Sequence, residues 1–190
     1  IPVLESLINK ADVLLIGGAM AYTFLQAQGK GVGKSIVEED KLQIAADIMK
    51  KAGSSGVKLI LPLDHVMATA PDSQEIALVA DSYPLPDNLL GVDIGPKTIA
   101  EYEKYIKSAK TIFWNGPLGI FEVKPFSRGT VEIARAVAES GAFSVVGGGD
   151  SIAAIQQAGV ADRISHISTG GGASLEYIAY GSLPGIEALK

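Results

Sequence analysis

Short apolar runs that stop at or near glycine recur along this chain, and they constrain its fold more than any other feature. Segments with the three-to-four-residue spacing of amphipathic helices separate these runs. Continuous apolar strands that alternate with helices are typical of parallel sheets buried on both faces by crossover helices. We therefore predict an α/β protein with a mainly parallel sheet. The predicted strands are 13–16, 58–63, 111–114, 144–146 and 165–168.

The helices between these runs are predicted from apolar spacing. The clearest is predicted to follow a capping box, Ser35 and Glu38, and to end at Gly53. Residues 64–93 are rich in proline and aspartate and predict a hairpin-like excursion rather than a boundary between domains. We therefore expect one domain over residues 1–190. The other predicted helices are 3–11, 19–28, 97–108 and 127–140.

The composition excludes several classes of function. A formal charge of −5 argues against a surface for nucleic acid or an anionic membrane, because both need clustered lysine and arginine. No apolar run approaches the roughly 20 residues of a membrane-spanning helix. The absence of cysteine excludes disulfides, zinc-thiolate sites and thiol catalysis. We expect a cytoplasmic protein with no nucleic-acid partner and no membrane partner.

The sequence SVVGGGDS contains the clearest candidate site. Gly147, Gly148 and Gly149 follow a predicted strand, and Asp150 and Ser151 open a predicted helix. Glycines at such a turn let backbone N–H groups approach a phosphate closely at the positive end of the helix dipole. At this point two interpretations remain open: Asp150 or Ser151 is simply the N-cap of the helix, or Asp150 is a carboxylate ligand for Mg²⁺ bound to the phosphates.

A second turn of the same type lies in the sequence HISTGGGAS. Gly170, Gly171 and Gly172 again stand between a predicted strand and a predicted helix. Two triple-glycine turns about twenty residues apart fit consecutive strand–helix units, whose turns meet at one edge of a parallel sheet. The sequence therefore predicts a phosphate site with two walls of backbone amides.

The run FWNGPLGIFE is the most unusual part of the sequence. Trp114 and Phe121 are predicted to be core aromatic residues. Asn115 and Glu122 are polar residues that flank a Gly-Pro turn at the end of a strand, where they could contact a ribose or orient phosphates.

Other motifs fail on spacing. The GKS at 33–35 is not a P-loop, because Gln28 occupies the position of its first glycine. A dinucleotide fingerprint starting at Gly147 fails at Ile152, which disfavours a dehydrogenase. His65 and His166 lack partners at metal-ligand or triad spacing and are interpreted as structural or surface residues.

Five motifs together carry a resemblance to a known family. In chain order they are LLIGGAMAYTFL, GVDIGPKT, FWNGPLGIFE, VVGGGDS and HISTGGGASLE. The sequence resembles the carboxyl-terminal lobe of phosphoglycerate kinase. The resemblance implies a Rossmann-like three-layer domain over residues 1–190 that binds Mg-ADP or Mg-ATP. It implies a part of a glycolytic phosphotransferase, monomeric at full length, that moves phosphate between 1,3-bisphosphoglycerate and ADP and yields 3-phosphoglycerate and ATP.

The resemblance also implies roles for residues that match the family's motifs, and it favours the metal reading of Asp150. Residues implied at the adenine slot are Gly17, Gly18, Gly91 and Val92. Those implied at the ribose and phosphates are Asn115, Pro117, Glu122, Gly148, Gly149, Asp150, Ser151 and Gly172. Those implied to face the transferred phosphoryl group, as catalytic residues, are Gly147, Gly170 and Gly171.

Some features of the family are expected to precede Ile1. These are a lysine-bearing GGxKVxxK segment, the lobe that binds the glycerate substrate, and the first, central strand of the sheet. We expect the isolated chain to bind nucleotide without transferring phosphate. We also expect unpaired strand edges that make it unstable or prone to associate. The alternative is a non-catalytic nucleotide-binding or scaffold module.

Overall fold

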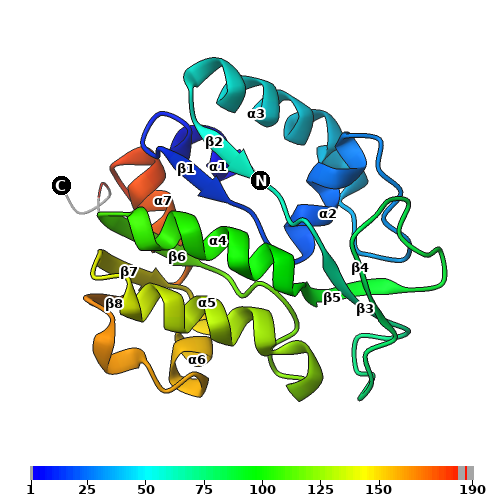
Figure 1. Ribbon diagram of the computed structural model, residues 1–190. Coiled ribbons are helices and arrows are strands. Elements are labelled where there is room, and N and C mark those ends of the chain that lie inside the picture. The colour runs from blue at the N-terminus through cyan, green and yellow to red at the C-terminus, as the bar shows by residue number, and fades with distance from the viewer. Residues whose placement is uncertain (1, 184–186, 188–190) are drawn as a thin grey trace.

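The computed structural model describes residues 2–183 and residue 187, and it confirms the α/β class. Helices and strands alternate along most of the chain (Figure 1). The helices are α1 (Pro2–Leu7), α2 (Gly18–Ala27), α3 (Leu42–Ser55), α4 (Pro96–Ser108), α5 (Arg128–Glu139), α6 (Gly149–Gln157) and α7 (Gly172–Tyr180). The strands are β1 (Val13–Leu15), β2 (Lys58–Ile60), β3 (His65–Ala68), β4 (Leu78–Ala80), β5 (Leu90–Ile94), β6 (Thr111–Asn115), β7 (Phe143–Gly147) and β8 (His166–Ser168).

Among the described residues the strands form three sheets instead of the single sheet that we predicted. Strands β1 and β2 pair in parallel, and so do β6, β7 and β8 in that order. Strands β4, β3 and β5 form a small antiparallel sheet. The prediction of parallel pairing is therefore confirmed, while one continuous sheet is not observed. The predicted association through unpaired edges stays a prediction.

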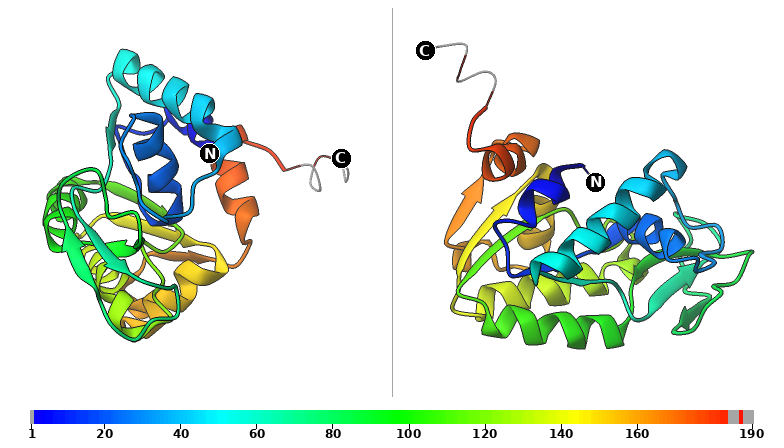
Figure 2. Two further views of the ribbon diagram at one scale, coloured as in Figure 1. Left: turned by 90° about the vertical axis from the view of Figure 1, so that its right-hand side faces the viewer. Right: turned by 90° about the horizontal axis from the view of Figure 1, so that it is seen from above.

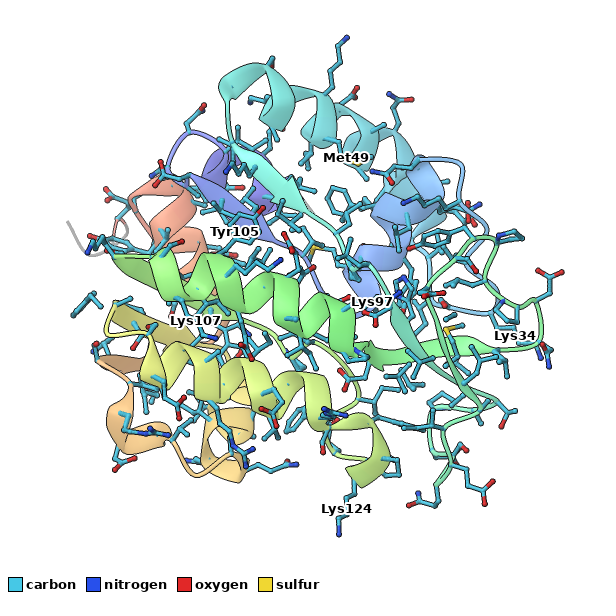
Figure 3. All side chains as sticks on the ribbon, viewed as in Figure 1. Lys34, Met49, Lys97, Tyr105, Lys107 and Lys124 are labelled. Carbon is cyan, nitrogen blue, oxygen red and sulfur yellow. The ribbon has the colours of Figure 1, made fainter. Side chains whose placement is uncertain are left out.

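Helices cover both faces of the parallel strands. Helix α4 packs beside α5, and α1 packs beside α7. Figure 2 shows α4 and α5 on one side of the strands and α1 and α7 on the other. This arrangement is the layered packing expected when the apolar faces of helices cover a parallel sheet. Charged side chains such as Lys34 and Lys124 project into solvent at the periphery (Figure 3).

Two large apolar clusters form the core of the parallel part. One lies among α4, α5, α6 and strands β6 and β7, and includes Tyr102, Trp114 and Ile155. The other lies among α1, α2, α3, α7 and β1, and includes Phe24 and Ile48. In each cluster the apolar faces of several helices pack against buried strand residues, as the predicted amphipathic patterns require.

The predicted bounds of α2, α4 and α5 agree with the structure to within one residue, but the predicted end of α1 and the predicted bounds of α3 are wrong. Ser35 is not a helix cap, because its hydroxyl accepts a hydrogen bond from the Gly91 N–H at 2.9 Å. Helix α3 begins at Leu42, after a short 3₁₀ turn, and continues past Gly53. Its last turn ends at Gly56, whose φ of 75° is the left-handed conformation common at helix ends.

The excursion predicted at 64–93 is an antiparallel hairpin of β3 and β4, followed by a strand that the sequence analysis did not predict. That strand, β5, pairs with β3 and has Gly91 and Asp93 among its five residues. These two residues interrupt the apolar run, so the local pattern does not indicate a buried strand.

Candidate functional site

The carboxyl ends of β6, β7 and β8 lie level with one another. The register pairs Asn115 with Gly147, and Gly147 with Ser168. Helices α6 and α7 begin within four residues of these strand ends. The structure therefore brings the two predicted glycine turns to one edge of the sheet, where α/β proteins bind ligands.

The first turn presents unpaired amides to solvent. Gly148 precedes α6 with a φ of 90°, which favours glycine. The hydrogen bond that closes the first turn of the helix runs from the Ile152 N–H to the Gly148 carbonyl at 3.0 Å. The amides at the start of an α-helix have no partner within the helix. Asp150 lies in this first turn, is exposed and makes no capping bond, so the N-cap reading of Asp150 is wrong.

The second turn lies next to the first. Gly171 precedes α7 with a φ of 55°. The hydroxyls of Ser168 and Ser174 are hydrogen-bonded to each other across this turn. A Cβ added to Gly147 would lie 3.3 Å from the Cβ of Ser174, which shows how closely the first turn approaches the start of α7. The two walls of amides predicted from the sequence are therefore adjacent.

The glycines of the candidate site differ in what surrounds them. At Gly149 and Gly172 an added Cβ would meet nothing within 4 Å, and neither residue has a positive φ. At Gly17 and Gly91 an added Cβ would collide with Leu118 and with the Tyr22 hydroxyl. Packing explains Gly17 and Gly91 and a φ of 63° explains Gly18, whereas neither packing nor φ explains Gly149 and Gly172.

Two polar residues predicted to contact a ligand form hydrogen bonds that join the strand ends. The Asn115 side-chain amide donates to the Gly147 carbonyl at 3.0 Å. The Ser151 hydroxyl accepts a hydrogen bond from the Gly116 N–H at 2.6 Å, and Ser151 is fully buried. These bonds tie the end of β6 to the end of β7 and to the first turn of α6.

The loop 116–122 connects the glycine turns to the other predicted residues. The Gly18 N–H donates to the Leu118 carbonyl at 3.1 Å, and the Ile120 N–H donates to the Val92 carbonyl at 2.8 Å. Pro117 lies within this loop, beside Gly18, and Glu122 is exposed at its end. The structure thus brings three of the residues predicted at the adenine slot, Gly17, Gly18 and Val92, against the loop 116–122. Val92 is buried, at 2% exposure.

The histidine interpretation agrees with the structure. His65 is buried between the hydroxyls of Tyr22 and Tyr83, at 3.2 and 2.7 Å from its two ring nitrogens. Burial lowers the pKa of His65 to about 4, against an electrostatic pull from Asp64. The other histidine, His166, is exposed at the start of β8.

One buried charged residue near the loop was missed by the sequence analysis. Asp93 is 3% exposed, and burial raises the pKa of its carboxyl to about 7, against hydrogen bonds from the Gly129 and Ile94 amides. The sequence does contain a signal for this residue, because an aspartate inside the otherwise apolar stretch of β5 indicates a buried carboxylate. Among the described residues no three His, Cys, Asp or Glu side chains gather as metal ligands.

The fold and the two glycine turns define a class of α/β proteins, in which such turns lead from the ends of parallel strands into helices at one edge of the sheet. Comparison with models of protein families identifies the particular family. A family model described as phosphoglycerate kinase matches residues 1–180. The chain belongs to the phosphoglycerate kinase family, whose members are glycolytic transferases.

Relatives and solved structures agree with this family. The chain is 55% identical over 190 residues to phosphoglycerate kinase of Anaeromyxobacter sp. (strain K), covering 100% of this chain and 48% of the relative. A structure of phosphoglycerate kinase from Coxiella burnetii matches with a TM-score of 0.92 and 43% identity, over 99% of this chain and 49% of that one. The enzyme from Pyrococcus horikoshii OT3 matches with a TM-score of 0.84 and 36% identity, over 98% and 47%.

These comparisons replace one prediction by a broader statement. The motifs led us to identify the chain as the carboxyl-terminal, nucleotide-binding lobe. The matches establish the family over residues 1–180 of this chain and about half the length of each relative, and these figures assign the chain to neither lobe. The chain is an α/β portion of a phosphoglycerate kinase, with parallel sheets and a small antiparallel sheet. No helix among the described residues is long and apolar enough to cross a membrane.

Proposed function

We propose that the two glycine turns bind a phosphate group of a phosphorylated substrate of the phosphoglycerate kinase reaction. The observation that carries the proposal is the free space at Gly149 and Gly172, two glycines that neither φ nor internal packing requires. A ligand that approaches the backbone closely gives such positions a reason to lack a side chain.

The physical basis is the convergence of two helix N-termini. Helices α6 and α7 begin at the same edge of the sheet, and a Cβ at Gly147 would touch Ser174 of α7. The amides at the start of α6 and the positive end of each helix dipole favour an anion there. Backbone amides neutralise charge on phosphate oxygens without a basic patch, which agrees with the net charge of −5.

Asp150 is our candidate for contact with a magnesium ion. It is a single exposed carboxylate in the first turn of α6, beside the proposed phosphate position. Mg²⁺ in phosphate sites is held by one or two carboxylates together with substrate oxygens and waters, so one carboxylate fits a metal that arrives with the phosphates. When bound, the ion would neutralise charge on the phosphate oxygens.

The residues of the chain would contribute mainly positioning. Bonds from Asn115 to Gly147, and from Gly116 to Ser151, fix the strand ends that carry the first turn. In phosphoryl transfer, positioning and neutralisation of charge supply most of the catalysis. The proposed role of Gly147, Gly170 and Gly171 is to place backbone amides around the phosphoryl group.

Isothermal titration calorimetry tests the proposal with two phosphorylated ligands of the reaction, Mg-ADP and 3-phosphoglycerate. We expect one of them to bind the 190-residue chain, and Gly149→Ala and Gly172→Ala to weaken that ligand at least tenfold. Gly53→Ala is the matched control, because Gly53 also has open space around it but lies within α3. Equal binding by all four proteins, or no binding of either ligand, contradicts the proposal.

A further inference from the structure

Asp93 lies where strand β5, the loop 116–122 and helix α5 meet. One carboxylate oxygen accepts a hydrogen bond from the Gly129 N–H at 2.6 Å, and the other accepts from the Ile94 N–H at 2.9 Å. Gly129 is in the first turn of α5, so the carboxylate caps that helix from a strand 36 residues away in sequence.

The loop packs directly on this carboxylate. A Cβ added to Gly119 would collide with Asp93 and with the Val92 carbonyl, and one added to Gly129 would also collide with Asp93. The Leu118 N–H donates to the hydroxyl of Thr130 on α5 at 3.0 Å. The loop is therefore held between β5 and α5. Asp93 contacts Gly119 of the loop and Gly129 of α5.

Few charged groups face Asp93. The Arg128 guanidinium, at the start of α5, lowers the pKa of Asp93. The Tyr22 hydroxyl of α2 is influenced electrostatically by Asp93, and it is hydrogen-bonded to His65 of β3. Burial outweighs these influences and raises the pKa of Asp93 to about 7.

We propose that Asp93 is a positioning residue of the candidate site: the ionised carboxylate caps α5 and holds the loop 116–122 against β5, and protonation weakens that attachment. A charge-assisted hydrogen bond to a helix N-terminus is stronger than its neutral counterpart, so the neutral acid holds the Gly129 amide less firmly. The loop also carries Gly116, whose N–H bonds to Ser151, so its position reaches the first glycine turn. The effect on ligand binding rests on the proposed function.

Trp114 provides a readout that does not depend on any ligand. It is the single tryptophan of the chain, and its indole N–H donates to the Gly116 carbonyl at 2.7 Å, at the start of the loop. Its fluorescence therefore reports the geometry of the loop. We expect the emission of the folded protein to change between about pH 6 and pH 8 with a midpoint near pH 7, the pKa of Asp93.

Variants of two aspartates separate positioning from general stability. Asp93→Asn keeps an acceptor for the Gly129 amide but does not titrate, so the fluorescence transition should disappear. Asp64→Asn is the matched control, because Asp64 is also buried and caps a helix, α4, from a neighbouring strand end. It should keep the transition. Persistence of the transition in Asp93→Asn, or its absence in the unmodified protein, overturns the proposal.

Arg128→Gln keeps the test decisive if Asp93→Asn does not fold. Arg128 is exposed, and removal of its charge should move the Trp114 midpoint to higher pH. An unmoved midpoint in this variant contradicts the proposal. Calorimetry of ligand binding at about pH 6 and pH 8 completes the test. The ratio of the affinity at pH 8 to the affinity at pH 6 should be larger for the unmodified protein than for Asp93→Asn. Comparison of the two proteins cancels the titration of the ligand itself. Failure of any ligand to bind contradicts the proposed function and leaves the fluorescence result to decide the role of Asp93.

Discussion

At the scale of single residues, the glycines fall into three groups that the sequence does not distinguish. Gly148 and Gly171 adopt positive φ, Gly91 and Gly119 admit a neighbouring side chain, and the free positions at the two turns have neither reason. The glycine clusters correctly predicted turns between a strand and a helix, whereas the phosphate role of these turns stays a prediction. The packing of the Tyr22 hydroxyl against Gly91 was not predicted, because a contact between residues 69 positions apart leaves no local pattern.

This division predicts opposite effects for two glycine substitutions. Gly149→Ala should leave the free energy of unfolding unchanged or raise it by about 0.4–1 kcal/mol, because an alanine restricts the unfolded chain and meets no obstacle. Gly91→Ala should lower it by about 1–3 kcal/mol, because the new methyl group overlaps the buried Tyr22. Urea denaturation measures both. A destabilised Gly149→Ala would show that the turn itself requires glycine there.

At the scale of elements, the one helix cap predicted from a local motif is absent, and a long-range contact caps another helix. The predicted capping box at Ser35 is wrong, whereas α4 is capped by Asp64, whose carboxylate accepts hydrogen bonds from the Lys97 and Thr98 amides at 2.9 and 2.8 Å. The Thr98 hydroxyl completes the cap with a bond to the same carboxylate at 2.7 Å. Periodicity predicted the body of α4 because the stripe is local, but its cap comes from a residue more than 30 positions earlier.

Removal of this cap should be costly. Asp64→Ala removes the acceptor of the buried Thr98 amide and of the partly buried Lys97 amide, and it should lower the free energy of unfolding by about 1–3 kcal/mol. Asp81→Ala is a suitable control, because it removes an exposed ion pair with Lys97 from the same end of α4 and should change stability much less. Equal effects of the two variants in urea denaturation would contradict the role of the cap.

At the scale of the whole molecule, helix α4 joins the two parallel sheets. The Tyr102 ring lies in the apolar cluster beside β6, while its hydroxyl donates to the Ile16 carbonyl and lies 3.2 Å from the Ile60 carbonyl, at the ends of β1 and β2. The alternation of strands and helices predicted layers, but not which side chain crosses from one sheet to the other. That crossing depends on packing between elements far apart in sequence.

Loss of the Tyr102 hydroxyl should weaken this connection. Tyr102→Phe leaves a buried carbonyl without a donor, and we expect the free energy of unfolding to fall by about 1–3 kcal/mol. Tyr105→Phe removes a hydroxyl from the partly exposed side of the same helix and should have a smaller effect. Thermal or urea unfolding compares the pair, and a Tyr102→Phe variant as stable as the unmodified protein would show that the bond contributes little.

The pH dependence of stability depends on two buried groups with opposite signs. The pKa of His65 falls from 6.5 to about 4 on folding, so the unfolded chain binds more protons between these values and stability rises with pH. The pKa of Asp93 rises from 3.8 to about 7, so the folded chain binds more protons and stability falls as pH rises through this window. Between about pH 4 and pH 6.5 the two contributions oppose each other.

Variants that lack one of the two groups should therefore show the pH dependence of unfolding free energy that the other group causes. Relative to the unmodified protein, the stability of Asp93→Asn should rise more steeply from about pH 4.5 to pH 6.5, and that of His65→Gln should fall more steeply. One full proton of difference corresponds to at most about 1.4 kcal/mol per pH unit. Urea denaturation at half-unit intervals of pH measures these slopes, and the double variant should return toward the unmodified profile because it lacks both groups. Parallel profiles for all four proteins would show that neither buried group changes its protonation on folding.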